Sequence, residues 1–264
     1  MSSPLHTAFT GAIPENYDRL LGPAWFGPAA KELVKRMASD PGGDVLEIAC
    51  GTGLVTRELR GKLDPARQLV ATDLNKPMLD YASTKLADMK GIEWREADAM
   101  SLPFPDARFG GVACGLGLMF VPDKKKTVAE MRRVLKPGGS LVISTWAALE
   151  KNTYAKLYSE TIDGLFPGDE EMRFRMPWAL NDEAVLRELL GGAGFKDIQV
   201  VEIRLPVGGD PRSIATGQVR GTPRGLLLEK KGMSMDEAIE RVTRAIEQMR
   251  EPGYATVIVT RARA

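Results

Sequence analysis

Cysteine and histidine are scarce in this chain. Two cysteines, Cys50 and Cys114, stand far apart in 264 residues and form no Cys-x-x-Cys pair, which argues against a disulfide framework or a zinc module. The only histidine is His6, near the first residue, so the main body of the chain holds no histidine dyad or triad unless His6 folds back onto it. This sparing use of cysteine predicts a reducing, cytoplasmic setting.

Long apolar runs and an excess of one charge are also missing. No stretch approaches the roughly 18 apolar residues of a membrane-spanning helix, and residues 1–11 carry neither the basic nor the apolar region of a signal peptide. Lys and Arg total 36 while Asp and Glu total 35, a net charge of +1. We therefore expect no membrane partner and no nucleic-acid partner, and we leave a homo-oligomer open.

The first part of the chain alternates short apolar segments with amphipathic helical ones. Hydrophobic residues make up 44% of the chain, enough for a sizeable core. Alternation of this kind predicts an α/β fold with a parallel sheet covered by helices on both faces. The expected strands are 44–49, 68–72, 92–96, 111–115 and 140–145, and the expected helices include 77–90 and 124–135.

The pattern changes after residue 146. Asn181 is the expected N-cap of one helix, and Ser234 opens another with a capping box to Glu237. Late strands are expected at 198–205 and 255–261.

The domain organisation follows from two weakly periodic segments, 147–180 and 207–233, which are rich in aromatic residues or in Gly and Pro. Long irregular insertions in compact domains are often lids or binding loops, so we expect these two to form a substrate cap. The prediction is one domain at 31–264, preceded by an N-terminal lid at 1–30.

The most informative segment is residues 45–56, VLEIACGTGLVT. An apolar strand runs into a Gly51-x-Gly53 turn and then into a helix that starts near Leu54. Glycines at such a turn permit positive φ and let a ligand approach the backbone closely. Asp73 follows Gly53 by 20 residues, where a carboxylate can accept hydrogen bonds from a ribose diol. The segment predicts a nucleoside ligand.

Two features separate this loop from a dinucleotide fingerprint. Thr56 stands where the third glycine would be, and Glu47 lies inside the strand just before the turn. A carboxylate there would repel a pyrophosphate but attract an ammonium or a sulfonium. The alternative is that Glu47 caps the following helix or pairs with a lysine.

Several ordered motifs carry a family resemblance. The motifs are 47–53, 72–79, 97–106, 114–123 and 133–139, together with 16–19 near the start and 193–195 later in the chain. They resemble those of class I S-adenosylmethionine (SAM)-dependent methyltransferases, in the type-11 or ubiquinone/menaquinone-biosynthesis-like branch. The resemblance is continuous over about residues 40–146.

The resemblance implies SAM as the cofactor and a Rossmann-like, doubly wound sheet of about seven strands, mostly parallel with an antiparallel last strand. It also implies that Cys114 and Gly115 line the floor under the sulfonium and that Tyr17 closes over the methionine end. The cofactor-binding residues that it implies are Tyr17, Glu47, Ala49, Cys50, Gly51, Thr52, Gly53, Asp73, Leu74, Met78, Asp98, Ala99, Met100, Cys114 and Gly115.

Each part of the cofactor has an implied partner. Glu47 and the backbone of the glycine loop would cradle the methionine part, and Asp73 would bind the ribose hydroxyls. Met78 would pack beside the adenine, with Asp98 accepting from its exocyclic amine and the Ala99 amide reaching a ring nitrogen. These positions agree with the general rule that ligands bind at the carboxyl ends of the strands in open α/β sheets.

The sequence assigns no catalytic residue and no metal ligand. Methyl transfer from a sulfonium needs mainly the positioning of two reactants, with a base only if the acceptor must lose a proton. Weakly supported bases are His6, Tyr17, Asp123, Glu150 and Tyr154. The expected walls of the acceptor pocket, each with plain packing as the alternative, are Trp25, Phe26, Phe120, Trp146, Trp178 and Arg220.

The resulting prediction is a SAM-dependent methyltransferase that acts on a small molecule by in-line displacement. A SAM-binding sensor or partner subunit without methyl transfer is the alternative, because no base is evident. An NAD-dependent oxidoreductase is disfavoured by Thr56 and Glu47.

Overall fold

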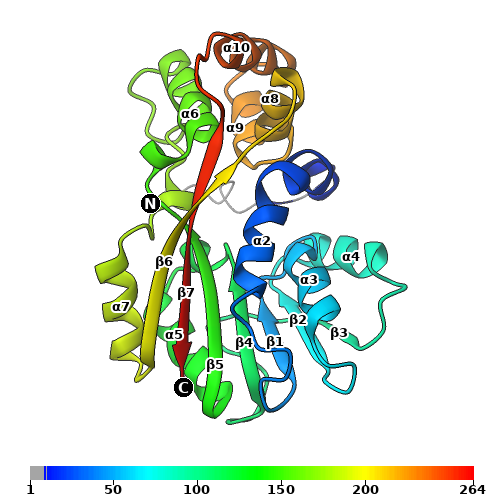
Figure 1. The fold of residues 1–264 in the computed structure, drawn as a ribbon. Helices are drawn as coiled ribbons and strands as arrows, with labels where there is room; N and C mark the ends of the chain where they lie inside the picture. Colours follow the sequence, from blue (N-terminus) through cyan, green and yellow to red (C-terminus); the bar gives the residue numbers. More distant parts are fainter. Residues whose placement is uncertain (1–8, 10) are drawn as a thin grey trace.

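The computed structural model describes residue 9 and residues 11–264. A seven-stranded sheet with the order β3-β2-β1-β4-β5-β7-β6 forms its centre (Figure 1). Only β7 runs antiparallel to its two neighbours, which confirms the mostly parallel Rossmann-like sheet. The strands are β1 (Val45–Ile48), β2 (Leu69–Asp73), β3 (Ile92–Glu96), β4 (Phe109–Gly115), β5 (Leu135–Trp146), β6 (Lys196–Pro206) and β7 (Tyr254–Arg263).

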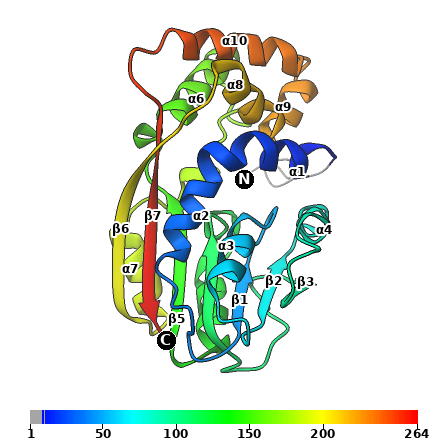
Figure 2. The same ribbon diagram turned by 45° about the vertical axis from the view of Figure 1, so that its right-hand side comes forward.

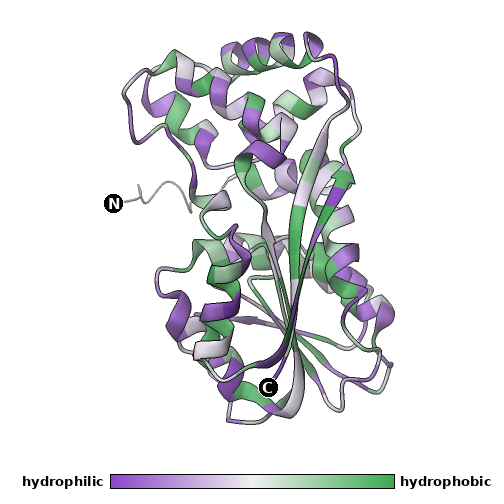
Figure 3. Ribbon diagram, turned by 60° about the vertical axis from the view of Figure 1, so that its left-hand side comes forward, coloured by the Kyte–Doolittle hydropathy of each residue, from purple (hydrophilic) through white to green (hydrophobic). Residues whose placement is uncertain are grey.

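Helices cover both faces of the sheet. On one face, α2 (Gly27–Val34) packs against α3 (Leu54–Lys62) and against β4, β5 and β7. On the other face, α5 (Lys124–Val134) and α7 (Glu183–Gly192) pack against each other and against β5 and β6 respectively. Strands β1, β4 and the second half of β5 are buried because helices lie on both sides of the sheet. Figure 3 shows that hydrophobic and hydrophilic residues alternate along the helices around the sheet.

The segments beyond the sheet differ from the expected irregular insertions, because they are largely helical. They contain α6 (Thr153–Leu165), α8 (Pro211–Arg220) and α9 (Arg224–Lys230), which pack with α10 (Met235–Glu247) into a group that we call the helical cap. Figures 1 and 2 show the cap beyond the carboxyl ends of the central strands, joined to the sheet by the long β6 and β7. These helices are short, and Gly164 in α6 and Gly217 in α8 lower the helix propensity of their segments. The helical pattern is therefore weak in the sequence, and packing within the cap stabilises the helices.

The N-terminal segment runs between the cap and the sheet (Figure 2). It consists of α1 (Ile13–Asn16), a ten-residue π-helix η2 (Tyr17–Phe26) and α2, so the expected boundary at residue 30 falls inside a helix. Extended π-helices are rare and often occur at functional sites. The hypothesis about His6 lies outside the described residues.

Most expected elements are present, with shifted ends. Helix α4 (Lys76–Lys85) stops earlier than expected, and β5 starts five residues before residue 140 because Leu135 pairs with Phe109 across an irregularity in the register. Remaining short turns of 3₁₀-helix are η3 (Leu118–Phe120), η4 (Leu149–Lys151) and η5 (Met176–Trp178).

One predicted cap is wrong and one is confirmed. The N-cap of α7 is Asp182 rather than Asn181, because the Asp182 carboxylate accepts from the Ala184 amide while the Asn181 side chain donates to the Trp178 carbonyl. The Ser234 hydroxyl accepts from the Glu237 amide and caps α10 as predicted, whereas the Glu237 carboxylate accepts from Arg241 and does not complete the expected capping box. No helix in the described part of the chain is long and apolar enough to cross a membrane.

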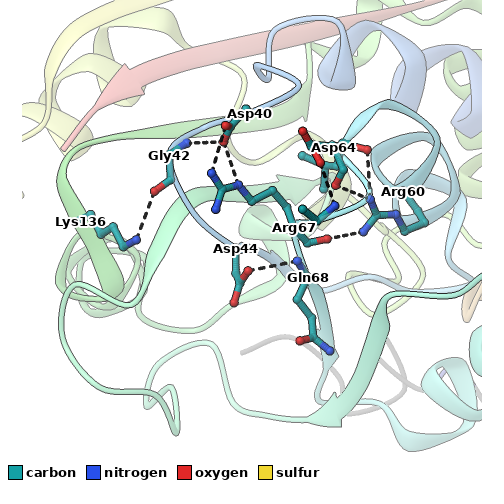
Figure 4. Close-up of polar contacts among 10 residues, drawn as sticks. Asp40, Gly42, Asp44, Arg60, Asp64, Arg67, Gln68 and Lys136 are labelled. Carbon is teal, nitrogen blue, oxygen red and sulfur yellow. Dashed lines mark hydrogen bonds and ion pairs between the residues drawn. The ribbon is translucent and has the colours of Figure 1, made fainter.

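Polar contacts fix the amino ends of β1 and β2, at the edge opposite the glycine loop (Figure 4). Arg67 donates to both carboxylate oxygens of Asp40 at 3.0 and 3.1 Å, and Asp44 accepts from the Gln68 amide at 3.1 Å. Arg60 donates to the carbonyl oxygens of Arg67 at 2.6 Å, Asp64 at 2.9 Å and Leu63 at 3.0 Å. Arg60 therefore ties the end of α3 to the start of β2.

We expect Arg60→Met to lower the free energy of unfolding by about 1–3 kcal/mol, because it removes charged hydrogen bonds to several backbone carbonyls. The matched control is Arg57→Met, since Arg57 is exposed on the same helix and, among the described residues, its one ion pair is with its neighbour Glu58 at 3.4 Å. That control should change stability by less than about 0.5 kcal/mol. Urea unfolding checks both; equal effects would contradict the tie between α3 and β2.

Candidate active site

A small hollow of about 50 Å³ lies at the carboxyl ends of β1, β4 and β5. Its position follows from the sheet, because parallel neighbours bring the ends of these strands to one edge. The residues that line it are Tyr17, Phe26, Ala30, Glu47, Ala49, Cys50, Gly51, Thr52, Leu54, Val55, Gly115, Leu116 and Ser144.

The glycine loop holds an unusual backbone conformation. Gly51 and Gly53 have φ of 54° and 78°, and Ala49 adopts φ 56° despite its Cβ. A Cβ on Gly53 would lie 2.9 Å from the Leu86 side chain, so this glycine lets α4 approach. A Cβ on Gly51 would have nothing nearer than the Met78 methyl at 3.9 Å. Gly51 therefore presents bare backbone to the hollow, as close approach of a ligand requires.

Asp73 holds the loop from the end of β2. Its carboxylate accepts from the Gly51 amide at 2.8 Å and from the Asn75 amide at 2.7 Å. Burial raises its pKa, and the amides of Asn75, Gly51 and Leu74 oppose that rise. A carboxylate oxygen with one amide donor still has a lone pair for a second donor, so Asp73 can position the loop and bind a ligand hydroxyl together.

Glu47 is a buried carboxyl group with a strongly raised pKa. Its side chain is 1% exposed, and its Oε2 atom has no hydrogen-bond partner among the described residues. Burial, reinforced by the nearby charge of Asp73, raises the pKa of Glu47 to about 8, although the Thr56 hydroxyl and amide oppose this. The alternative of a helix cap holds in part through Thr56, but no lysine lines the hollow in the described chain. The site is thus acidic and lacks a resident cation.

Two aromatic residues that line the hollow, Tyr17 and Phe26, belong to a longer chain of contacting rings. Tyr17 stacks on Phe26 with ring centroids 4.2 Å apart, and Phe26 lies 5.9 Å from Trp146. Phe9 packs edge-on against Tyr17 at 6.0 Å and against Phe120 at 6.4 Å. We call this chain of five rings the aromatic roof.

The structure brings together about half of the residues expected to bind the cofactor. Those lining the hollow are Tyr17, Glu47, Ala49, Cys50, Gly51, Thr52 and Gly115, and Asp73 joins them through Gly51. Gly53 and Met78 lie directly behind the loop, while the Cys114 side chain is buried against Gly117. Leu74, Asp98, Ala99 and Met100 lie outside the lining, where Asp98 accepts from the Met100 amide at 2.8 Å.

Sequence reasoning missed three classes of lining residue. Leu116 has φ 56°, and strained non-glycine residues of this kind cluster at functional sites. Ser144 reaches the hollow because it pairs with Gly115 across β4 and β5. Leu54, Val55 and Ala30 come from helices, and Phe26 was expected only as a wall for the acceptor. Ser144 could have been predicted to line the hollow only if the register between β4 and β5 had been known.

The proposed bases receive little support. Burial, followed by the charges of Asp18 and Asp73, raises the pKa of Tyr17 far above its ordinary value, so its hydroxyl stays protonated at neutral pH. Asp123 caps α5 through the Lys126 amide at 2.9 Å. Glu150 is exposed, and Tyr154 packs edge-on against Trp25 with centroids 6.0 Å apart. Among the described residues, no group of three or more metal-ligating side chains comes together.

Comparison with known proteins identifies the family. Residues 46–143 match the family described as "Methyltransferase domain". The chain is 30% identical over 220 residues to the demethylmenaquinone methyltransferase of Lactobacillus johnsonii, covering 77% of this chain and 89% of that protein. The Staphylococcus epidermidis enzyme of the same name is 31% identical over 209 residues, covering 74% and 86%. The chain belongs to the class I SAM-dependent methyltransferases.

Within that family, this methyltransferase falls in the menaquinone- and ubiquinone-biosynthesis-like branch, and it transfers methyl groups to a small molecule. This membership decides against the NAD-dependent oxidoreductase and against a binding protein without methyl transfer. It agrees with a loop that lacks the third glycine and holds a buried carboxylate.

Solved structures show the same fold. A phosphoethanolamine N-methyltransferase of Haemonchus contortus, crystallised with phosphomonomethylethanolamine and S-adenosylhomocysteine (SAH), superposes with a TM-score of 0.62 at 18% identity, covering 97% of this chain and 58% of that one. The YcgJ protein of Bacillus subtilis gives 0.60 at 16% identity, covering 89% and 97%.

The raised pKa of Glu47 predicts how stability depends on pH. The Glu47 carboxyl binds its proton more tightly in the folded protein than in the unfolded chain. The folded protein therefore loses stability as the pH rises from the unfolded pKa, near 4.5, to the folded pKa of about 8. We therefore expect the unfolding free energy of the ligand-free protein to fall between pH 5 and pH 8.

The variant Glu47→Gln should flatten this dependence, because a neutral amide resembles the protonated acid. Urea unfolding at several pH values measures it, with Glu188→Gln, an exposed position on α7, as the control. Parallel curves for wild type and Glu47→Gln would show that Glu47 is ionised in the folded protein across this range.

Proposed function

We propose that the hollow binds SAM and that the acceptor is a planar aromatic compound held beneath the aromatic roof. The observation that carries the proposal is the pair of buried carboxylates, Glu47 and Asp73, with no cation among the described residues lining the hollow. SAM is cationic at its α-ammonium and its sulfonium, so it would supply the missing positive charge. A diphosphate would meet repulsion there.

The residues present fit the cofactor. The unpartnered Oε2 of Glu47 would accept from the ammonium, and Asp73 would accept from the ribose hydroxyls in addition to its amide donors. Gly51 would let the ligand lie against the backbone. Met78 would pack beside the adenine, while Asp98 and the Ala99 amide would bind its edge. These roles rest on the family motifs and on the geometry of the loop.

The acceptor class rests on the roof and on the relatives. The curated relatives are named for demethylmenaquinone, a compound with a flat aromatic ring system. Of the expected wall residues, Phe26, Phe120 and Trp146 belong to the aromatic roof, whereas Trp25 pairs with Tyr154 and Arg220 pairs with Asp236 at 2.7 Å. Flat rings of this kind suit a flat apolar acceptor and exclude water.

The chain's own contribution to the reaction is positioning. SAM, when bound, supplies a methyl group on a good leaving group, so correct alignment of the acceptor can lower the barrier by roughly 7–11 kcal/mol. Tyr17 keeps its proton and closes the site through stacking. The absence of an evident base near the hollow, within the described residues, favours an acceptor that arrives already nucleophilic. A cytoplasmic location and a homo-oligomer stay predictions.

Calorimetry and a methyl-transfer assay test the proposal. SAH should bind the wild-type protein, and NAD at the same concentration should not. A demethylmenaquinol probe added to the SAM-loaded protein should release SAH in step with methylated product. Failure of SAH to bind would refute the cofactor assignment; SAH binding without turnover of any planar aromatic acceptor would refute the acceptor class alone.

A single substitution separates the role of Asp73 from general damage. We expect Asp73→Ala to weaken SAH binding by about 1–3 kcal/mol, or roughly 5- to 150-fold, because it removes a charged acceptor. Asp73→Asn, which keeps one acceptor oxygen, should lose less. The control is Asp80→Ala, an exposed residue of α4 that pairs with Lys76. Unchanged affinity in Asp73→Ala, measured by calorimetry, would remove Asp73 from the site.

A further inference from the structure

Unpartnered polar atoms gather in a second place, inside the helical cap. One group in the described residues belongs to the cofactor site and includes Glu47 Oε2 and Thr52 Oγ1. A second group lies on α6, α8 and α9 and includes Ser159 Oγ, Gln218 Oε1, and both Nε and Nη1 of Arg224. Buried polar groups are normally hydrogen-bonded, so each unpartnered group requires an explanation.

Arg224 is the exceptional member of the second group. Its side chain is fully buried at the start of α9, with its guanidinium 5.1 Å from the centre of the Tyr158 ring. Only Nη2 has a partner, the Asp163 carboxylate. The Nε and Nη1 atoms together carry three N–H donors without an acceptor. A buried guanidinium with most of its donors idle is costly unless something accepts from them.

The charges around Arg224 also indicate that an anionic group is missing. Asp163 is the carboxylate that pairs with Arg224, and it also pairs with Arg175 of the segment between α6 and α7. One carboxylate therefore faces two guanidinium groups, which leaves this cluster with an excess of one positive charge. An anionic oxygen group would balance it and would meet the idle donors.

The cluster lies next to the roof of the cofactor site. Gly221, three residues before Arg224, is so near η2 that a Cβ on it would be 3.2 Å from the Tyr17 Cα. Tyr154, one helical turn before Tyr158 on α6, packs against Trp25, the neighbour of Phe26. The same turn is tied to α8, because the Gln218 side chain donates to the Tyr154 carbonyl at 3.0 Å.

We propose that Arg224 binds an anionic oxygen of the methyl acceptor, either an ionised ring hydroxyl or a carboxylate. This inference rests on the proposed function and narrows its substrate class to aromatic anions. The placement of the charged groups supports this proposal. The hollow holds buried carboxyl groups and suits a cation, whereas the cap holds the buried Arg224 guanidinium, which suits an anionic second reactant. An anionic acceptor also needs no base to become nucleophilic, in line with the lack of an evident one near the hollow in residues 11–264.

Matched ligand pairs test the proposal on the wild-type protein saturated with SAH. The probes are 2-naphthoate against 2-naphthamide, benzoate against benzamide, and ionised 4-nitrophenolate against 4-nitroanisole. We expect at least one anion to bind ten or more times tighter than its neutral partner by calorimetry. The carboxylate and phenolate arms identify which oxygen group is preferred. Equal or absent binding in all three pairs overturns the proposal.

Variants assign the preference to Arg224. Arg224→Met should abolish the preference for the anion while SAH affinity stays within about twofold, and Arg224→Lys should restore part of it. The control is Arg212→Met, an exposed arginine of α8 that pairs with Glu240. If Arg224→Met folds and keeps the preference, Arg224 is structural only. If that variant does not fold, the ligand pairs on the wild type still decide.

The two proposals fail in different ways. Loss of SAH binding by the wild type would refute the proposed cofactor, whatever the probes do. Normal SAH binding with turnover of neutral acceptors and no preference for anions would refute only the role of Arg224.

Discussion

The site depends on one electrostatic constraint, a carboxylate that the sheet buries without a counter-charge. Glu47 sits in the central strand β1, paired on one side with Ala71 of β2 and on the other with Ala113 of β4, so it cannot turn away from the edge of the sheet. Asp73 adds a second buried carboxyl group while ordering Gly51. The folded protein therefore keeps a strained, acidic hollow that a cationic nucleoside would stabilise.

The helical cap and the sheet contribute buried groups of opposite charge type. The sheet edge provides buried carboxyl groups, whereas the cap provides a buried guanidinium. If the proposed roles hold, a reaction between a sulfonium and an electron-rich acceptor would benefit from this arrangement, because each reactant would be drawn to a group of opposite charge. The π-helix η2 belongs to this roof, since Tyr17 and Phe26 stand at its two ends.

The sequence was sufficient to predict an element where its own residues fix the backbone conformation or where the element is a buried strand between parallel strands. The apolar runs of β1, β2 and β4, the Ser234 cap and the helix after Asp123 were readable because their residues fix backbone conformation or burial directly. The cap helices α6, α8 and α9 were not readable, because they are short and each contains a glycine that weakens the helical pattern. The choice between Asn181 and Asp182 was equally open, since both residue types cap helices well.

The sequence by itself determined the glycine loop, the acidic residues within β1 and at the end of β2, and the family, because these depend on residue type at fixed spacing. Only the tertiary structure decided which side chains meet across elements. It placed Ser144 opposite Gly115, brought Phe26 over the loop, and left Arg224 buried with idle donors beside Asp163. Contacts between residues 61 positions apart, such as Asp163 and Arg224, arise from packing and leave no periodic trace in the chain.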